Sequence, residues 1–358
     1  MARPTAAAKR HSTRLPAGKR PATLGAVTTS QLGLFAPTTL KSVEPAAAEA
    51  WAQLAGQLPP SLRMGTSSWS FPGWNELVYA AKYDKTQLAR EGLVAYSAHP
   101  LLRAVGLDRT FYRPESAESF NALAEQTPDD FRFVVKAPRA LTTPRMRDTG
   151  GRMQDNPIFL DAEFAREAVA APTLAGLGDK LGVLLLQFPP FGPQEVGGAR
   201  HFAEQLSAVL ATLPTSITWA VELRNRGLFT PRYVRALRGA GALHCYVHHP
   251  SMPPLEHQLE AVPVEHARVT LVRWMLRREM TYEQARDRFS PFGALVAPDG
   301  PTREAVATLC RRAAARAQPT FVIVNNKAEG SAPLSIQALA ETLVANPGRA
   351  EQKVMTPT

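Results

Sequence analysis

Cysteine is scarce in the 358-residue sequence, with only Cys245 and Cys310 present. Two thiols cannot build a disulfide framework or an all-cysteine zinc site, so a small disulfide-stabilised scaffold is excluded and a reducing, cytoplasmic compartment is expected. Long apolar runs are also missing, since no stretch approaches the roughly 18 apolar residues of a membrane-spanning helix. We therefore expect no membrane association. Length and composition favour a globular protein with a large core.

Acidic residues are absent from the first 43 positions, which carry seven of the ten net positive charges of the chain. Residues 1–58 are rich in Ala, Pro, Thr and Arg, with an Ala-rich helix candidate near 45–57. This composition predicts a flexible, disordered basic N-terminal arm. An acid-free, Arg-rich start is also typical of organelle transit peptides, and that alternative stays open.

From Arg63 onward, short apolar runs alternate with amphipathic stretches, which is typical of repeated βα units. Eight strands are predicted, at 63–68, 107–112, 131–137, 182–188, 217–224, 243–248, 268–275 and 321–325. The stretch 249–267 contains four prolines and shows no helix where the sixth one belongs. Eight parallel strands covered by helices close most economically as a barrel. The prediction is an α/β protein with one TIM-type (β/α)8 barrel domain at 59–346 and a short tail at 347–358.

Polar residues interrupt the apolar runs at the predicted carboxyl ends of the strands, where a barrel places its functional groups. Glu222 and Arg224 are two apart on one strand and share a face. The cations at neighbouring strand ends exceed what one glutamate can neutralise, and guanidinium groups suit bidentate phosphate or carboxylate recognition. An internal ion pair is the alternative. The predicted ligand-binding residues are Lys136, Arg139, Gln187, Arg224, Arg273, Asn325, Asn326 and Lys327.

The segment after the third strand is a second basic stretch, with Arg139, Arg145, Arg147 and Arg152 around two glycines. It strengthens the expectation of an anionic ligand, with an ordinary solvated surface loop as the alternative.

Glu222 and His249 are the candidates for acid or base catalysis, because both types of side chain can transfer a proton. The adjacent His248 raises the question of a metal ion, which needs at least three convergent ligands. Glu222 is the one obvious further ligand. We therefore expect no metal and no cofactor, with a divalent metal as the alternative.

Seven stretches resemble one known family. They are GTSSWSFPGW at 65–74, TFYRP at 110–114, FVVKAP at 133–138, LGVLLLQFPP at 181–190, AVELRN at 220–225, VRW at 272–274 and FVIVNNKAEGSAP at 321–333. Together they are similar to the family known as domain of unknown function 72, or YecE-like. The resemblance implies a TIM-type barrel with a polar pocket at the strand carboxyl ends and an unsettled activity. Fold analogy within that family points towards DNA-processing, endonuclease-IV-like barrels.

Carried over position by position, the polar residues that recur in the family fall on Lys136, Gln187, Glu222, Arg224, Arg273, Asn325 and Asn326. The second strand departs from the usual VEINSTFY, because VGLDRTFY places Gly106 where the family has an acid and Arg109 where it has a small residue. Thr143 stands where a histidine is often found. Any mechanism that needs this acid or this histidine is in doubt here.

The arm carries a second resemblance, the stretch QLGLF at 31–35. It is similar to the short peptide with which bacterial DNA polymerases and repair proteins dock on the sliding clamp. An exposed linear motif belongs in a mobile polar arm. The predicted partner-binding residues are Gln31, Leu32, Leu34 and Phe35. The alternative is that the three apolar side chains pack back on the barrel.

The leading hypothesis is a barrel that binds a phosphate-bearing ligand, DNA or RNA, and hydrolyses a phosphodiester. One alternative is an enzyme acting on a small sugar phosphate or carboxylate. Another is a non-catalytic accessory protein of the sliding clamp.

Overall fold

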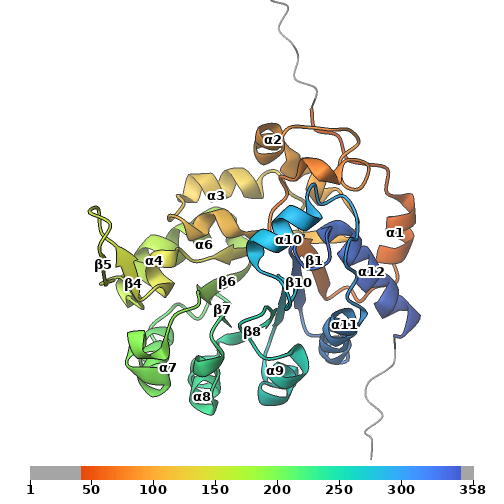
Figure 1. Cartoon of the computed structure of the whole chain (residues 1–358). Coiled ribbons are helices and arrows are strands. Elements are labelled where there is room, and N and C mark those ends of the chain that lie inside the picture. The colour runs from red at the N-terminus through yellow and green to blue at the C-terminus, as the bar shows by residue number, and fades with distance from the viewer. Residues whose placement is uncertain (1–41, 348–358) are drawn as a thin grey trace, which may run out of the picture. The chain divides into compact units, whose positions relative to one another are not determined.

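The computed structural model describes residues 42–347, and at its centre eight parallel strands form a closed barrel (Figure 1). Around the barrel the order is β1, β2, β3, β6, β7, β8, β9 and β10, with β10 pairing back onto β1. The bounds are β1 (Leu62–Thr66), β2 (Leu102–Leu107), β3 (Arg132–Lys136), β6 (Leu181–Phe188), β7 (Trp219–Leu223), β8 (Leu243–His248), β9 (Thr270–Trp274) and β10 (Thr320–Val324). The predicted TIM-type (β/α)8 barrel is confirmed.

Helices follow the strands and surround the barrel (Figure 1). They are α1 (Glu49–Ala55), α2 (Lys85–Ser97), α3 (Ala117–Ala124), α4 (Arg139–Thr142), α5 (Ala162–Phe164), α6 (Ala171–Leu177), α7 (Gly198–Leu210), α8 (Pro231–Ala240), α9 (Leu255–Ala261), α10 (Tyr282–Phe289), α11 (Gly300–Ala314) and α12 (Ala332–Ala345). A π-helical stretch, Ala165–Ala170, joins α5 to α6. Side chains before the helices satisfy their first backbone N–H groups: Asp84 accepts two such bonds at α2, and Thr281 forms a capping box with Gln284 at α10.

Two predictions about individual elements are wrong. The second strand ends at Leu107 rather than beginning there, because the apolar run Leu102–Leu107 forms β2 and Asp108–Phe111 turns as a 3-10 helix. The Thr110 hydroxyl holds this turn, 2.6 Å from the carbonyl oxygen of Leu107. The stretch 249–267 does contain a helix, α9. The four prolines of the stretch lie before the first residue of this helix or after its last, where they remove no helical hydrogen bond.

The ordered domain begins before residue 58, where the sequence placed the end of the arm. Val43 is buried, and the Ala46 amide donates to the Val78 carbonyl at 3.0 Å. Helix α1 lies against α12 (Figure 1). The stretch 42–58 is therefore part of the fold. The predicted clamp motif at 31–35 and most of the tail at 347–358 lie outside the described residues.

An apolar layer fills the barrel up to the carboxyl ends of the strands, where the polar side chains begin. Side chains from every barrel strand except β1 form one buried cluster, including Val134, Leu185, Ala220, Leu271 and Ile323. On β1 the cluster meets Gly65, where a Cβ would lie 1.8 Å from the Ala104 carbonyl oxygen. Since side chains alternate along a strand, the residue two positions further on faces inward again. Those residues are Lys136, Gln187, Glu222, Arg273 and Asn325, so a polar layer lies on the apolar one.

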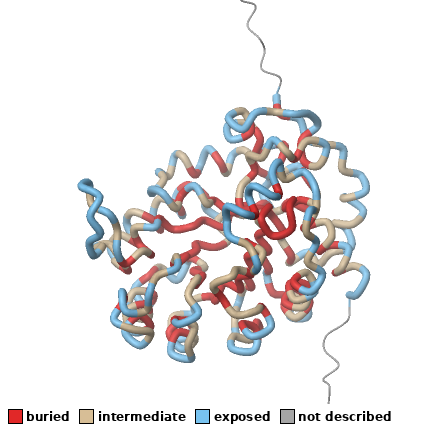
Figure 2. Tube along the Cα trace, in the orientation of Figure 1, coloured by how far each residue is buried: buried red, intermediate tan, exposed pale blue. Residues whose placement is uncertain are grey.

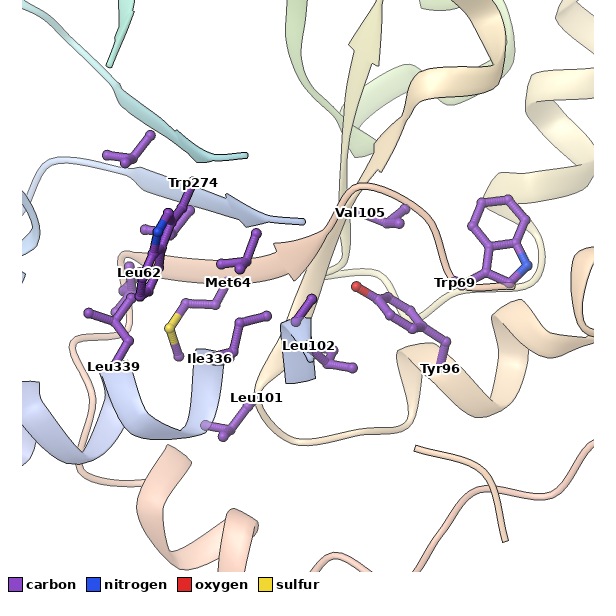
Figure 3. Close-up of a cluster of buried hydrophobic side chains, with 14 of the residues drawn as sticks. Leu62, Met64, Trp69, Tyr96, Leu101, Leu102, Val105, Trp274, Ile336 and Leu339 are labelled. Carbon is purple, nitrogen blue, oxygen red and sulfur yellow. The ribbon is translucent and has the colours of Figure 1, made fainter. Parts of the chain in front are cut away.

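Outside the barrel, a second apolar layer joins the strands to the helices. Figure 3 shows Leu62, Met64 and Leu102 of β1 and β2 with Ile336 and Leu339 of α12. The buried part of the trace follows the strands, and the exposed part follows the outer sides of the helices (Figure 2). Each fully buried large side chain contributes roughly 1.5 to 3 kcal/mol. Packing on both faces fixes the strands that present the polar layer.

Candidate functional site: a cationic pocket at the barrel mouth

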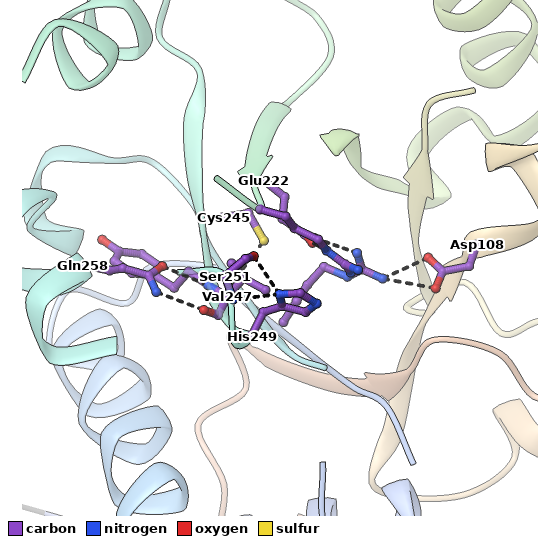
Figure 4. Close-up of polar contacts among 10 residues, drawn as sticks. Asp108, Glu222, Cys245, Val247, His249, Ser251 and Gln258 are labelled. Carbon is purple, nitrogen blue, oxygen red and sulfur yellow. Dashed lines mark hydrogen bonds and ion pairs between the residues drawn. The ribbon is translucent and has the colours of Figure 1, made fainter. Parts of the chain in front are cut away.

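A chain of ion pairs crosses the polar layer and links β7 and β9 to the turn that follows β2. Arg273 of β9 has an exposed fraction of 1%, donates to Glu222 Oε2 of β7 at 2.6 Å, and also donates to Asp108 Oδ1 at 2.9 Å. Arg224 donates through Nε to the other oxygen of Glu222 at 2.8 Å. In Figure 4, Asp108 and Glu222 lie on either side of the guanidinium group from which both accept hydrogen bonds, that of Arg273. Two guanidinium groups therefore meet two carboxylates, and the network is neutral as a unit.

The network keeps its acid groups ionised. Burial alone would raise the pKa of Glu222, but the charges and hydrogen bonds of Arg273 and Arg224 lower this pKa to about 2. Burial acts to lower the pKa of Arg273, but Glu222 and Asp108 hold it above its usual value. Glu222 therefore stays a carboxylate at neutral pH and positions two arginines.

Two lysines at the mouth lack such partners. Lys136 ends β3 with an exposed fraction of 8%, and its ammonium lies 3.7 Å from the centre of the Phe111 ring. Lys327, which follows β10, has an exposed fraction of 6%, and its ammonium lies 4.1 Å from the centre of the Tyr282 ring. Within residues 42–347 no carboxylate lies within ion-pairing distance of either ammonium. Burial lowers the pKa of Lys136 to about 8.

The adjacent histidines point to different environments. His249 lies at the pocket, with Nδ1 2.7 Å from the hydroxyl of Ser251, and Nε2 has no hydrogen-bond partner in the described part of the chain. His248 is buried, with Nε2 3.9 Å from Asp299. Burial first, and the nearby Arg224 next, lower the pKa of His249 to about 4. At neutral pH its imidazole is uncharged, and because Nδ1 accepts a hydrogen bond from the Ser251 amide at 3.2 Å the ring hydrogen lies on Nε2.

These groups open into a cavity of about 640 Å³, which lies within the size range of small-molecule sites. Among the described residues that line it, the basic ones outnumber the single acidic one, Asp108. The basic ones are Lys85, Arg109, Lys136, Arg224, Arg286 and Lys327, and the aromatic ones are Trp69, Phe71, Phe111, Tyr112, Tyr282 and Phe292. The mouth therefore combines positive charge with flat apolar rings.

Of the residues predicted to bind ligand, Lys136, Arg224, Asn325 and Lys327 line this cavity, and so does the predicted acid or base His249. Arg273 and Glu222 form the ion network described above, outside the lining. Gln187 is buried beside Glu222 in the strand register, and its carbonyl oxygen has no partner in the described structure.

Two of the predicted residues are placed differently. Arg139 begins α4, is exposed and is not among the lining residues. Asn326 is buried and accepts hydrogen bonds from the Trp74 indole at 3.2 Å and from the Ala332 amide at 2.8 Å. Its amide oxygen thus supports the start of α12 instead of facing the cavity.

Several pocket residues escaped the sequence reasoning. Asp108 follows β2 directly, but the misplaced second strand concealed that it stands at a strand carboxyl end. Gly106, where the related family has an acid, faces the barrel interior, since a Cβ there would lie 3.3 Å from the Ile323 side chain. Asp108, two residues after Gly106, supplies the carboxylate that contacts Arg273. Phe111, Tyr282 and Phe292 lie in or near irregular segments, and no periodic pattern in the sequence marks them.

The basic stretch after β3 forms a β-hairpin, β4 (Arg145–Arg147) and β5 (Met153–Asp155). It projects away from the barrel beside α4 (Figure 1). Arg145, Arg147 and Arg152 are all exposed, and Arg145 lies 3.4 Å from Asp155. The hairpin therefore presents cations to solvent beyond the cavity.

Residues 42–347 contain no group of three His, Cys, Asp or Glu side chains arranged to hold a metal ion. In the same residues, no helix has the length and apolar character needed to cross a bilayer.

Comparison with known proteins places this barrel among relatives. UPF0759 protein YunF of Bacillus subtilis is 27% identical over 164 residues, which are 45% of this chain. The chain spans about half the length of this curated relative, 51%. The crystal structure of a DUF72 family protein from Thermotoga maritima has a TM-score of 0.54 at 22% identity, covering 79% of this chain and 98% of that one. A DUF72 family protein from Enterococcus faecalis has a TM-score of 0.50 at 16% identity, covering 79% and 97%.

These structural similarities, at low identity, establish the fold that the barrel already displays. The sequence match extends further, because a family model covers residues 63–357, which is the whole barrel except the first residue of β1, with the pocket groups that its strands carry. The chain belongs to the family described as protein of unknown function DUF72.

Proposed function

We propose that the pocket at the barrel mouth binds a phosphate-bearing ligand. The observation that carries this proposal is the pair of nearly buried lysines, Lys136 and Lys327, neither of which forms an ion pair within residues 42–347. Removing a charge from water is costly unless an opposite charge replaces the lost hydration. The arginines beneath the lysines are already neutralised by Glu222 and Asp108. An anionic ligand supplies the missing negative charge.

We further propose that this ligand is a nucleic acid. The aromatic rings of Trp69, Tyr112 and Tyr282 line the mouth, and bases stack on such rings with little dependence on sequence. The Arg-rich β4–β5 hairpin offers phosphate contacts beyond the cavity, which a polyanion uses and a small phosphate ester does not.

The chemistry that fits these groups is hydrolysis of a phosphodiester. His249 is the acid or base candidate in this proposal; its Nδ1 accepts a hydrogen bond from the Ser251 amide at 3.2 Å, so the neutral imidazole offers Nε2–H as a hydrogen-bond donor to a phosphoryl oxygen. Lys136 and Arg224 stabilise negative charge on the phosphoryl oxygens. Glu222 holds Arg224 and Arg273 in place, a positioning role that fits a carboxylate kept ionised by two guanidinium groups.

Mobility-shift titration with single-stranded and duplex DNA at two salt concentrations tests the proposal. Lys136→Met and Lys327→Met are expected to weaken binding of both DNA and inorganic phosphate. Arg145→Ala with Arg147→Ala is expected to weaken DNA binding only and to lower the salt slope by about 1 for each lost phosphate contact.

Arg200→Ala is the matched control, because Arg200 is an exposed arginine that pairs with Glu204 on α7. It is expected to leave every affinity unchanged. Unaltered affinity for phosphate and DNA in both lysine variants would overturn the anion site.

The second candidate is an enzyme acting on a small sugar phosphate or carboxylate. The cavity volume of about 640 Å³ favours it, since a single small molecule fills such a site. Phosphate binding that depends on both lysines, together with DNA affinity that the hairpin variants leave unchanged, would support this candidate over nucleic acid. A sliding-clamp accessory function is a separate proposal that rests on residues 31–35.

A further inference from the structure

The cavity contains one amine whose surroundings suit covalent chemistry. Lys136 is the last residue of β3, so its backbone is fixed by strand pairing, and the Thr110 hydroxyl oxygen lies 2.6 Å from its carbonyl oxygen. The side chain is almost fully buried, yet it lines the cavity. Its nitrogen has no hydrogen-bond or ion-pair partner in residues 42–347. A lysine that serves only as a structural cation is normally hydrogen-bonded or paired when buried.

We propose that Lys136 is a nucleophilic amine that forms an imine with the carbonyl carbon of a phosphate-bearing aldehyde or ketone. This inference rests on the proposed phosphate site and names the class of substrate bound there. Lys136 would supply the bond to carbon, and Arg224 and Lys327 at the same cavity would hold the phosphate.

The balance of the step is simple. The uncharged amine attacks the carbonyl carbon to form a carbinolamine, in which a C–N bond replaces the C=O π bond. Loss of the hydroxyl group as water then gives the imine, so the amine loses two hydrogens and the carbonyl loses its oxygen. No oxidant or reductant takes part. The departing hydroxyl takes its proton from solvent, because His249 at the same cavity is uncharged at neutral pH and has no imidazolium proton to transfer.

The environment favours the uncharged amine that the step requires. Burial lowers the pKa of Lys136 to about 8; the charges of Asp108 and Glu222 act against this shift, and those of Arg273 and Arg224 act with it. A lysine in a model peptide has a pKa of about 10.4. At pH 7 the uncharged fraction of Lys136 is therefore on the order of 100-fold larger than that of a free lysine.

Reductive trapping tests the proposal on the full-length protein. Pyridoxal 5′-phosphate and pyridoxal are compared as probes in the presence of borohydride, and the labelled lysine is identified by peptide mass spectrometry. We expect the phosphorylated probe to label Lys136 at least tenfold faster than pyridoxal, with a rate that rises through about pH 8 and is level above it. Lys136→Arg keeps the positive charge and should abolish the label while retaining phosphate binding.

Lys180→Arg is the matched control, because Lys180 is a partly buried lysine outside the cavity whose ammonium donates to the Ala124 carbonyl at 2.8 Å. This variant should leave labelling at Lys136 intact. If the phosphorylated probe binds in competition with inorganic phosphate but leaves Lys136 unlabelled, the imine is overturned and the anion site stands. If pyridoxal labels Lys136 as fast as its phosphate, the amine is nucleophilic but the phosphate site fails.

Two further substrates distinguish the sources of the carbonyl group. Glyceraldehyde 3-phosphate represents a small sugar phosphate, and an oligonucleotide with an abasic deoxyribose represents an aldehyde within DNA. A borohydride-stable adduct at Lys136 with the first alone assigns the site to small molecules. An adduct with the oligonucleotide, lost in Lys136→Arg and weakened by the hairpin variants, assigns it to DNA. No adduct at Lys136 with either substrate would overturn the proposal.

Discussion

Replacing Glu222 by glutamine tests whether the ion network holds the barrel mouth together. The substitution keeps the shape of the side chain but removes the charge that both Arg273 and Arg224 contact. Breaking a buried ion pair from one side typically costs about 3 to 5 kcal/mol, because the remaining charge is left without compensation. Arg273 keeps its bond to Asp108 and Arg224 is partly exposed, so the lower end, about 3 kcal/mol, is expected. For a domain of this size that loss lowers the melting temperature by roughly 6 °C.

The pH dependence of stability gives an independent check. The pKa of Glu222 is lower in the folded protein than in the unfolded chain, about 2 against about 4.3. Its contribution is therefore fully present above about pH 5 and is lost as the pH falls towards 2. Glu222→Gln should have a smaller decrease in stability between pH 5 and pH 3 than the wild type.

Urea unfolding followed by circular dichroism at pH 7 and at several acidic pH values measures both effects. Glu204→Gln is the control, since Glu204 pairs with Arg200 on the exposed side of α7. It should change the free energy of unfolding little. The reasoning would be refuted if Glu222→Gln lowered the free energy of unfolding by less than about 1 kcal/mol and lost stability between pH 5 and pH 3 as the wild type does.

Two further predictions concern the arm and the barrel interior. A peptide spanning residues 28–38 is expected to bind the sliding clamp of its own organism with a micromolar dissociation constant, measured by fluorescence anisotropy. Changing Leu34 and Phe35 to Ala should abolish this binding without altering the melting temperature of the barrel, and a loss of several degrees would show instead that they belong to the fold. Gly65→Ala should destabilise the protein by more than 3 kcal/mol, because the new methyl group would overlap the backbone of β2. Gly239→Ala, in α8 with open space around it, should stabilise by about 0.5 to 1 kcal/mol, and equal effects of the two substitutions in urea unfolding would contradict this account.

The predictable part of the site follows from alternation along strands. Glu222 lies two residues after Ala220 of the apolar layer, and Arg273 lies two after Leu271, so both were placed correctly by periodicity. Asp108 was not, because Arg103 interrupts the apolar run of β2, and the following turn was read as the strand. Arg103 is explained by its pairing with Asp130 at 2.9 Å, a contact that a single sequence does not reveal.

Two aromatic residues of the pocket, Tyr282 and Phe292, were missed for a different reason. Tyr282 lies at the start of α10 and Phe292 just after that helix, and they meet Lys327 only because β9 and β10 are neighbours. Helix α9 was missed because its prolines were counted without regard to their position, although Leu255 and Leu259 lie one turn apart on a buried face.

The neutrality of the ion network affects which ligands the barrel tolerates. In the proposed anion site Arg224 and Arg273 are paired with carboxylates, so most of the unbalanced positive charge comes from Lys136 and Lys327, each a point charge with rotatable donors. A guanidinium group binds planar anions through two parallel hydrogen bonds and so discriminates between anion shapes, whereas an ammonium group mainly attracts negative charge to one point. If the proposed site binds anions in this way, it would accept phosphate esters, diesters and carboxylates alike, and the aromatic rim of this pocket would carry the chemical selectivity.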